Sequence, residues 1–233
     1  MNPANNGRWF HITAVLVSIL AFAAQLFSQG RSIEKWMAPG GLELHNVKAE
    51  AATYLGRQAI RLTDAGPASL DDASRFAVVP GTSFQDGTID ATISGDLLPG
   101  AIATARGFVG IAFRVSADRS HFECFYIRPT NGRADDQLRR NHSLQYISVP
   151  GFGWEKLRNE NPGVYESYAD LVPGQWTEVK IHVAGTHAQL FVNGATEPAL
   201  IVNDLKQPAA AGAIAFWVGV GTVAHFADLK VIH

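Results

Sequence analysis

WTEVKIHVAGTHAQLFVNG, residues 176–194, decides the fold class, because its apolar side chains recur at every second position. Such alternation is typical of a β-strand with one face in a core and the other in water. We therefore expect one set of side chains to point inward and the residues between them to face solvent. The inward set is Val179, Ile181, Val183, Leu190 and Val192, and the outward set includes Lys180 and His182.

Turn residues divide this stretch into successive strands. A short turn at Gly185 separates the two alternating runs, and Asn193-Gly194 is the dipeptide that most strongly favours a tight hairpin turn. Further strand-like segments are separated by clusters of Gly, Pro, Asn and Asp. They are residues 58–64, 87–95, 108–116, 121–129, 212–221 and 224–233. No long segment after residue 40 keeps a helical period. The sequence therefore predicts an all-β protein, a two-sheet antiparallel sandwich.

The order of several segments also resembles a known fold family. FQDGTIDATISG is followed by GFVGIAFRVS, HFECFYIRP, GQWTEVKIHVAGTHAQLFVNG and GAIAFWVGVGTVAHFADLKV. This order resembles the concanavalin A-like lectin/glucanase jelly roll, particularly bacterial laminin-G-like and 3-keto-disaccharide hydrolase-like domains, over residues 75–233. The resemblance implies two curved sheets, with ligands on the concave face or its rim loops. It implies no particular reaction, because this fold carries both enzymes and plain binders.

The overall composition limits the classes of function. The chain has 233 residues, of which 47% are hydrophobic, and this is enough for one large domain, expected over residues 31–233. A formal net charge of -2 provides no basic field for nucleic acid, so no nucleic-acid partner is expected. Cys124 is the single cysteine, which excludes an internal disulfide and predicts a buried small hydrophobic side chain.

Residues 1–30 differ from the rest of the chain. Residues 12–27 are almost wholly apolar and are shorter than the roughly 20 residues that a membrane-spanning helix needs. A polar start with Arg8, a short apolar run and small residues after it predict a helical secretory signal peptide over residues 1–30. Cleavage is expected after Ala23 or Gly30, with the later site favoured; an uncleaved membrane anchor is the alternative. The mature protein is then secreted or periplasmic, without stable membrane association.

RPTNGRADDQLRRNHSLQY, residues 128–146, is the densest polar run. Sugar recognition requires aromatic surfaces for the apolar faces of sugar rings, beside side chains that donate to and accept from hydroxyls. This run and its flanks supply that mixture, so we expect a carbohydrate or sugar-like polyol to bind there. The alternative is that Arg–Asp pairs merely hold a loop on the sandwich. The candidate ligand-binding residues are Tyr126, Arg128, Asn131, Arg133, Asp135, Arg139, Arg140, His142, Tyr146 and Trp154.

Catalytic signatures are weak. The laminarinase-type Glu-x-Asp-x-x-Glu strand is absent, and so is the Gly-x-Ser-x-Gly elbow of serine hydrolases. If the protein is an enzyme, Glu123, His142 or Glu166 are the candidates for acid or base. No metal or other cofactor is expected, because the histidines are scattered. Calcium in the acidic loops is the alternative, although those loops hold no run of oxygen ligands.

Three functions remain open at this point. The leading hypothesis is an exported, lectin-like β-sandwich that binds a carbohydrate. The second is a glycoside-cleaving hydrolase or lyase of the 3-keto-disaccharide hydrolase-like type, and the third is an adhesion or structural module that anchors a protein partner through Trp154. An enzyme requires two ionisable side chains that converge within about 5 to 10 Å beside the aromatic surface, whereas a binder does not.

Overall fold

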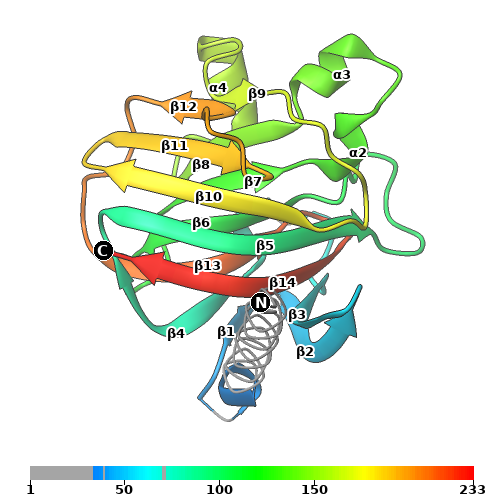
Figure 1. Cartoon of the computed structure of the whole chain (residues 1–233), viewed down its shortest axis with the longest axis vertical. Helices are drawn as coiled ribbons and strands as arrows, with labels where there is room; N and C mark the ends of the chain where they lie inside the picture. Colours follow the sequence, from blue (N-terminus) through cyan, green and yellow to red (C-terminus); the bar gives the residue numbers. More distant parts are fainter. Residues whose placement is uncertain (1–33, 39, 70–71) are drawn as a thin grey trace, which may run out of the picture.

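The computed structural model describes residues 34–38, 40–69 and 72–233. In this part of the chain, two antiparallel sheets of seven strands each pack against one another (Figure 1). Sheet A has the order β1 (Glu43–His45), β4 (Phe76–Phe84), β13 (Gly212–Val218), β6 (Val109–Val115), β7 (Phe122–Ile127), β8 (Leu144–Val149), β9 (Glu166–Ser167). Sheet B has the order β12 (Leu200–Val202), β11 (His187–Val192), β10 (Thr177–Ala184), β5 (Gly87–Leu97), β14 (Thr222–Ile232), β3 (Arg57–Asp64), β2 (Val47–Tyr54). The predicted two-sheet antiparallel jelly-roll sandwich is confirmed.

β10 and β11 show how alternation produces the sandwich. Ile181 of β10 is opposite Ile89 of β5 on one side and Leu190 of β11 on the other, and all three are buried. Lys180 and His182 are exposed. The remaining members of the predicted inward set, Val179, Val183 and Val192, are also buried. Both predicted faces of these strands are therefore confirmed.

The predicted turn after β11 forms, but it does not close a tight hairpin, because β12 begins only at Leu200. Asn193 and Gly194 both adopt left-handed backbone conformations, with φ of 52° and 71°. The Asn193 side chain accepts a hydrogen bond of 3.1 Å from the backbone N–H of Glu178, which fixes the turn against β10. The chain then returns as β12, which pairs with β11.

Sheet A is buried on both faces, which alternation alone did not predict. Its inner face joins sheet B in the main core, where Phe113, Phe216 and Phe226 are buried. Its outer face carries a second apolar layer, and every residue of β6 and β7 is buried. The buried members of that layer are Phe76, Val78, Ala112, Val115, Phe122, Cys124, Tyr126, Ile147, Ala215 and Trp217. Cys124 is a buried free thiol, as predicted.

Several elements were not predicted from the sequence, and most of them are short or exposed. They are the strands β1, β2, β4, β8, β9 and β12 and the helices α2 (Pro129–Gly132), α3 (Gln137–Asn141) and α4 (Trp154–Glu160). β2 shows little alternation, since most of its residues are exposed or half-buried. Helices of one or two turns are too short to display a helical period.

The predicted signal peptide, residues 1–30, lies outside the described residues and stays a prediction. Residues 34–37, at the start of the described part, are helical. Among the residues that the structure describes, no helix has the length and apolar character needed to cross a membrane.

Candidate ligand-binding site

The polar run 128–146 folds as two short helices beside α4, at one end of the sandwich (Figure 1). Asp136 precedes α3, and its carboxylate accepts a hydrogen bond of 3.0 Å from the backbone N–H of Arg139. The Arg139 side chain then reaches back to α2, where its Nε donates to Asn131 Oδ1 at 2.9 Å and its guanidinium to Thr130 O at 3.1 Å. Side-chain bonds of this kind can hold a segment whose helices are too short to be stable alone.

These helices form one wall of an open pocket of about 520 Å³, which we call the rim pocket. Its lining comes from the loop between β5 and β6 and from residues in or next to the helices α2, α3 and α4. Five of the ten candidate ligand-binding residues line it together: Arg128, Asn131, Arg139, His142 and Trp154. The other lining residues are Thr104, Arg106, Phe108, Asp136, Leu138, Glu155 and Arg158.

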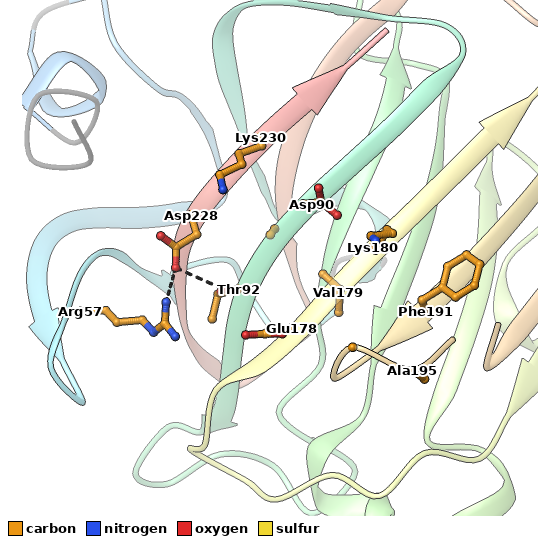
Figure 2. Close-up of a pocket in the computed structure, with 12 residues that line it drawn as sticks. Arg57, Asp90, Thr92, Glu178, Val179, Lys180, Phe191, Ala195, Asp228 and Lys230 are labelled. Carbon is orange, nitrogen blue, oxygen red and sulfur yellow. Dashed lines mark hydrogen bonds and ion pairs between the residues drawn. The ribbon is translucent and has the colours of Figure 1, made fainter. Parts of the chain in front are cut away.

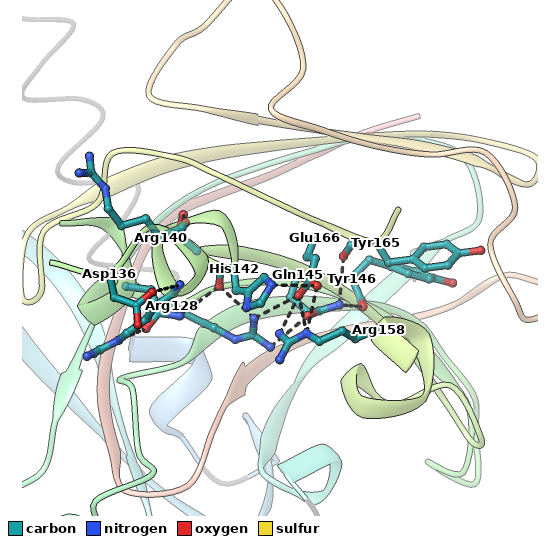
Figure 3. A network of polar contacts seen from close by, with 12 residues as sticks. Arg128, Asp136, Arg140, His142, Gln145, Tyr146, Arg158, Tyr165 and Glu166 are labelled. Carbon is teal, nitrogen blue, oxygen red and sulfur yellow. Dashed lines mark hydrogen bonds and ion pairs between the residues drawn. The ribbon is translucent and has the colours of Figure 1, made fainter. Parts of the chain in front are cut away.

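Arg128 forms the floor of the rim pocket and is only 3% exposed. Its guanidinium donates to the backbone carbonyl of His142 at 2.9 Å and to Gln145 Oε1 at 3.0 Å (Figure 3). It also lies 5.1 Å from the ring centre of Phe108 and 5.7 Å from that of Trp154. Arg128 therefore ties both half-buried aromatic rings to β8 and gives the pocket a rigid base.

A buried carboxylate stands behind this floor. Glu166 accepts three hydrogen bonds from Arg158, at 3.0 and 3.1 Å from Nε and at 2.7 Å from the terminal nitrogen. Its Oε1 lies 3.2 Å from Nε2 of His142, and its Oε2 lies 3.8 Å from the Arg128 guanidinium (Figure 3). Burial lowers the pKa of His142; Glu166 opposes this shift, while Arg158 and Arg128 add to it. His142 is therefore a neutral ring at neutral pH, oriented by a carboxylate.

Two candidate residues are buried and do not line the rim pocket. Tyr146 is fully buried in the main core, and its hydroxyl donates a 2.7 Å hydrogen bond to Glu123, which is also fully buried. Tyr126 lies beneath the rim pocket, 1% exposed, and its hydroxyl accepts from Arg128. Neither tyrosine lines the pocket, because alternate residues of β7 and β8 face the two apolar layers.

Three further candidates lie away from the pocket lining. Arg133 is exposed and makes two hydrogen bonds to Asp170, at 2.7 and 2.8 Å. Arg140 lies over the ring of Tyr168, 5.4 Å from its centre. Asp135 is exposed. In the expected alternative, Arg–Asp pairs hold the loop; the Arg133–Asp170 pair fits it, whereas Arg139 uses neutral acceptors instead.

Sequence reasoning missed the pocket residues that arrive from the β5–β6 loop, Thr104, Arg106 and Phe108. The hydroxyl of Thr130 on α2 donates to the backbone carbonyl of Arg106 at 3.1 Å and joins that loop to the polar run. Arg106 stands alone in an apolar, glycine-containing stretch, so no local pattern marks it. Among the residues that the structure describes, no three His, Cys, Asp or Glu side chains are placed to hold a metal ion.

A second hollow, of about 290 Å³, lies on the solvent face of sheet B (Figure 2). Charged side chains from neighbouring strands line it: Arg57, Lys180 and Lys230 with Asp90, Glu178 and Asp228. Asp228 accepts hydrogen bonds from Arg57 and from Thr92, the latter at 3.2 Å. Three cationic and three acidic side chains make the charge of this hollow balanced.

Comparisons with known proteins concern the fold. No protein-family model and no curated protein matches the chain. Among solved structures, it is similar to the carbohydrate binding module CBM66 from Bacillus subtilis, with 11% identity and a TM-score of 0.50, over 80% of this chain and 95% of that one. It is also similar to a Bacillus subtilis protein of unknown function with a galectin-like fold, with 13% identity and a TM-score of 0.50, over 78% and 86% of the two chains. The chain thus shares the jelly-roll sandwich of these proteins, while the laminin-G-like and 3-keto-disaccharide hydrolase-like resemblance stays an expectation.

Proposed function

We propose that the protein is an exported carbohydrate-binding domain whose ligand occupies the rim pocket. One observation carries the proposal: five of the residues expected from sequence to contact a sugar line a single open pocket. They bring the half-buried ring of Trp154, the amide of Asn131 and two guanidiniums together around it. An aromatic ring can face the apolar side of a sugar, and forked donors can bind its hydroxyls.

Two further observations support this function without assigning the ligand. The fold is shared with a protein described as a carbohydrate binding module. The apolar run at residues 12–27, followed by small residues, has the form of a signal peptide and supports export. A sugar that reaches the cell surface or periplasm is then the natural ligand class.

Glycan-array screening of the exported protein tests the proposal. We expect binding to a defined sugar class, and Trp154→Ala should abolish it, because the stacking surface is lost. Tyr168→Ala is the matched control: Tyr168 is 41% exposed and lies outside the rim pocket, so its removal should leave binding unchanged. If no glycan binds, or if binding survives Trp154→Ala and is lost in Tyr168→Ala, the rim pocket is not the sugar site.

The His142–Glu166 pair favours a second candidate, a glycoside-cleaving enzyme. A neutral imidazole that lines the pocket and is oriented by a carboxylate 3.2 Å away is the arrangement of a general base. Glu123 is not an acid or base candidate for this enzyme, because its carboxylate is buried against Tyr146 and does not line the pocket.

Turnover assays with ordinary and 3-keto glycosides separate the two functions. An enzyme should cleave at least one substrate, lose that activity in His142→Gln, and retain substrate binding. A binder should release no product from any of them. Trp154→Ala would weaken substrate binding under both functions, so product release is the measurement that distinguishes them.

A further inference from the structure

We infer that the rim pocket binds an acidic sugar, with the carboxylate or sulfate of that sugar held between Arg106 and Arg139. The inference rests on the proposed function and narrows it to a ligand class. It follows from an excess of positive charge among the residues that line the pocket. Four arginines line the pocket, Arg106, Arg128, Arg139 and Arg158, against the carboxylates of Asp136 and Glu155 in the lining and of Glu166 behind the floor.

Two of these arginines already have a carboxylate partner. Arg128 and Arg158 share the buried Glu166 behind the floor. Their charge is thereby partly neutralised from inside the protein, and their role is to support the pocket. The acid-binding capacity of the pocket therefore depends on the other two arginines.

Arg106 and Arg139 make hydrogen bonds to neutral acceptors. Arg106 donates to the backbone carbonyls of Ala103 and Ala105, both at 2.6 Å, and Arg139 donates to Asn131 and Thr130. Among the described residues, neither guanidinium forms an ion pair with a carboxylate. Asp136 is close by, but its Oδ1 accepts from the backbone N–H of Arg139 at the start of α3.

This lack of a carboxylate partner is unusual within the molecule. Apart from Arg106 and Arg139, and from Arg140 over Tyr168, every arginine in the described part of the chain has a carboxylate within ion-pair distance. Those arginines are Arg57, Arg61, Arg75, Arg114, Arg119, Arg128, Arg133 and Arg158. The hollow on sheet B differs from the rim pocket in this respect, because its three cationic side chains are matched by three acidic ones.

The two guanidiniums also affect one another. Both residues contact Thr130: Arg139 donates to its backbone carbonyl, and its hydroxyl donates to the backbone carbonyl of Arg106. Burial lowers the pKa of Arg106, and the positive charge of Arg139 lowers it further. Like charges in one partly buried pocket repel, and an anion placed between them removes that repulsion. Guanidinium groups suit this role because their paired N–H donors match the two oxygens of a carboxylate or sulfate.

The rest of the pocket suits the sugar ring that carries the anion. Phe108 and Trp154 supply ring faces, while the neutral His142 ring supplies a hydrogen-bonding group. An acidic sugar therefore meets charge at one side of the pocket and aromatic surface at its floor. An anion without a sugar ring would make only the first contact, so we expect it to bind more weakly.

Isothermal titration with matched ligands tests the inference on the unaltered protein. The probes are oligosaccharides of galacturonic, glucuronic and mannuronic acid, each as the free acid and as its methyl ester, and sulfated galactose oligosaccharides with their unsulfated parents. We expect at least one acidic probe to bind about tenfold to a hundredfold more tightly than its neutral counterpart, as charge-assisted hydrogen bonds predict. Comparing the uronic acid probes with the sulfated probes shows whether the pocket prefers a carboxylate or a sulfate. Binding of the acidic probe should weaken as NaCl is raised.

Single substitutions assign the effect to the two arginines. Arg106→Gln and Arg139→Gln should each remove most of the preference for the acidic probe, with folding checked by thermal melting. Arg133→Gln is the control, because it removes one positive charge from the same polar run but outside the pocket. It should leave the preference intact.

The outcomes separate this inference from the proposed function. If an acidic probe and its neutral counterpart bind equally well, and Trp154→Ala abolishes binding of both, the acidic specificity is wrong. The rim pocket is then still the sugar site. Absence of binding to every acidic and neutral probe would count against the sugar site itself. An acid preference that is lost in Arg133→Gln but kept in Arg106→Gln and Arg139→Gln would place the anion elsewhere.

Discussion

The hydroxyl of Tyr146 donates a 2.7 Å hydrogen bond to Glu123 Oε2 in the interior of the sandwich. The backbone N–H of Gln207 donates to the other carboxylate oxygen at 2.8 Å. Burial raises the pKa of the Glu123 carboxyl, although both hydrogen bonds oppose the rise. The folded protein therefore binds a proton at Glu123 more tightly than the unfolded chain does.

This shift predicts a pH-dependent stability. As the pH rises above the ordinary carboxyl pKa of 4.5, the unfolded chain loses the proton first, so the stability that protonated Glu123 contributes declines. Glu123→Gln removes the titration and keeps an acceptor for Tyr146. In urea melts, the stability of the variant relative to the unaltered protein should increase as the pH rises from about 4.5. A difference that stays constant with pH would show that the carboxyl pKa is not raised.

The two faces of β10 predict opposite effects of neighbouring substitutions. Ile181 is 1% exposed and packs between β5 and β11, so Ile181→Ala should destabilise the protein by roughly 2 to 5 kcal/mol, as large-to-small core changes do. Lys180 is exposed, and Lys180→Ala should fall within about 0.5 kcal/mol of neutral. Urea melts measure both. The reverse order would mean that the face assignment of β10 is wrong.

The fold could be predicted from the sequence where a strand has one solvent-exposed face and one buried face. Lys180 and His182 mark the outside of β10, so the inward set follows from period two alone. In β7 every residue from Phe122 to Ile127 is buried, Glu123 included, so the sequence does not show which side chains face which layer. The second apolar layer, and the position of Tyr126 within it, therefore needed the three-dimensional structure.

His225 predicts a second pH effect, of opposite sign. Its ring stacks on Tyr54 with 3.6 Å between centroids, and burial lowers its pKa to about 4; Arg61 adds to this shift and Glu50 opposes it. As the pH falls from 6.5 to about 4, His225 binds a proton in the unfolded chain but stays neutral in the folded protein, so stability is lost. The loss attributable to His225 should reach up to about 3 kcal/mol.

His225→Phe keeps an aromatic ring against Tyr54 and removes the titration. Chemical denaturation of both proteins across this pH range isolates the contribution of the histidine, because the other titrating groups are common to both. A variant that loses as much stability as the unaltered protein at low pH would show that His225 is protonated normally in the folded state.

The N-terminal segment predicts the form of the mature protein. If residues 1–30 are a signal peptide, the protein recovered from its native host should begin near Arg31 and be found outside the cytoplasm. N-terminal sequencing of each cell fraction measures this. An intact Met1 in the membrane fraction would support the uncleaved anchor instead.

The site could be predicted only as far as it is local in sequence. Arg128, Asn131, Arg139, His142 and Trp154 lie within one stretch of polar and aromatic residues, and five short-range neighbours of this kind can be recognised together. Arg106 and Phe108 reach the pocket through a loop that precedes the stretch by two strands. No local pattern shows that contact, because it depends on the packing of that loop against Thr130.

Arg139 and Arg140 are consecutive, and the structure assigns them different tasks. In an extended chain they would face opposite ways; in α3 they still diverge, with Arg139 toward α2 and Arg140 over Tyr168. Arg139→Ala leaves the buried amide oxygen of Asn131 without that donor, so it should cost about 1 to 3 kcal/mol of folding stability and also weaken ligand binding. The loop is therefore partly held by an arginine that also lines the pocket.

Arg140→Ala should cost less than about 1 kcal/mol, because only a contact with the exposed Tyr168 is lost, and ligand binding should be unchanged. The double variant should then match Arg139→Ala in both thermal melting and glycan titration. Arg139→Lys sharpens the comparison: it keeps the positive charge but loses the paired donors, so binding should be partly restored while the bridge to Asn131 stays weakened. A double variant that melts early yet binds its glycan with unchanged affinity would mean that this segment only holds the fold, and that the ligand contacts another surface.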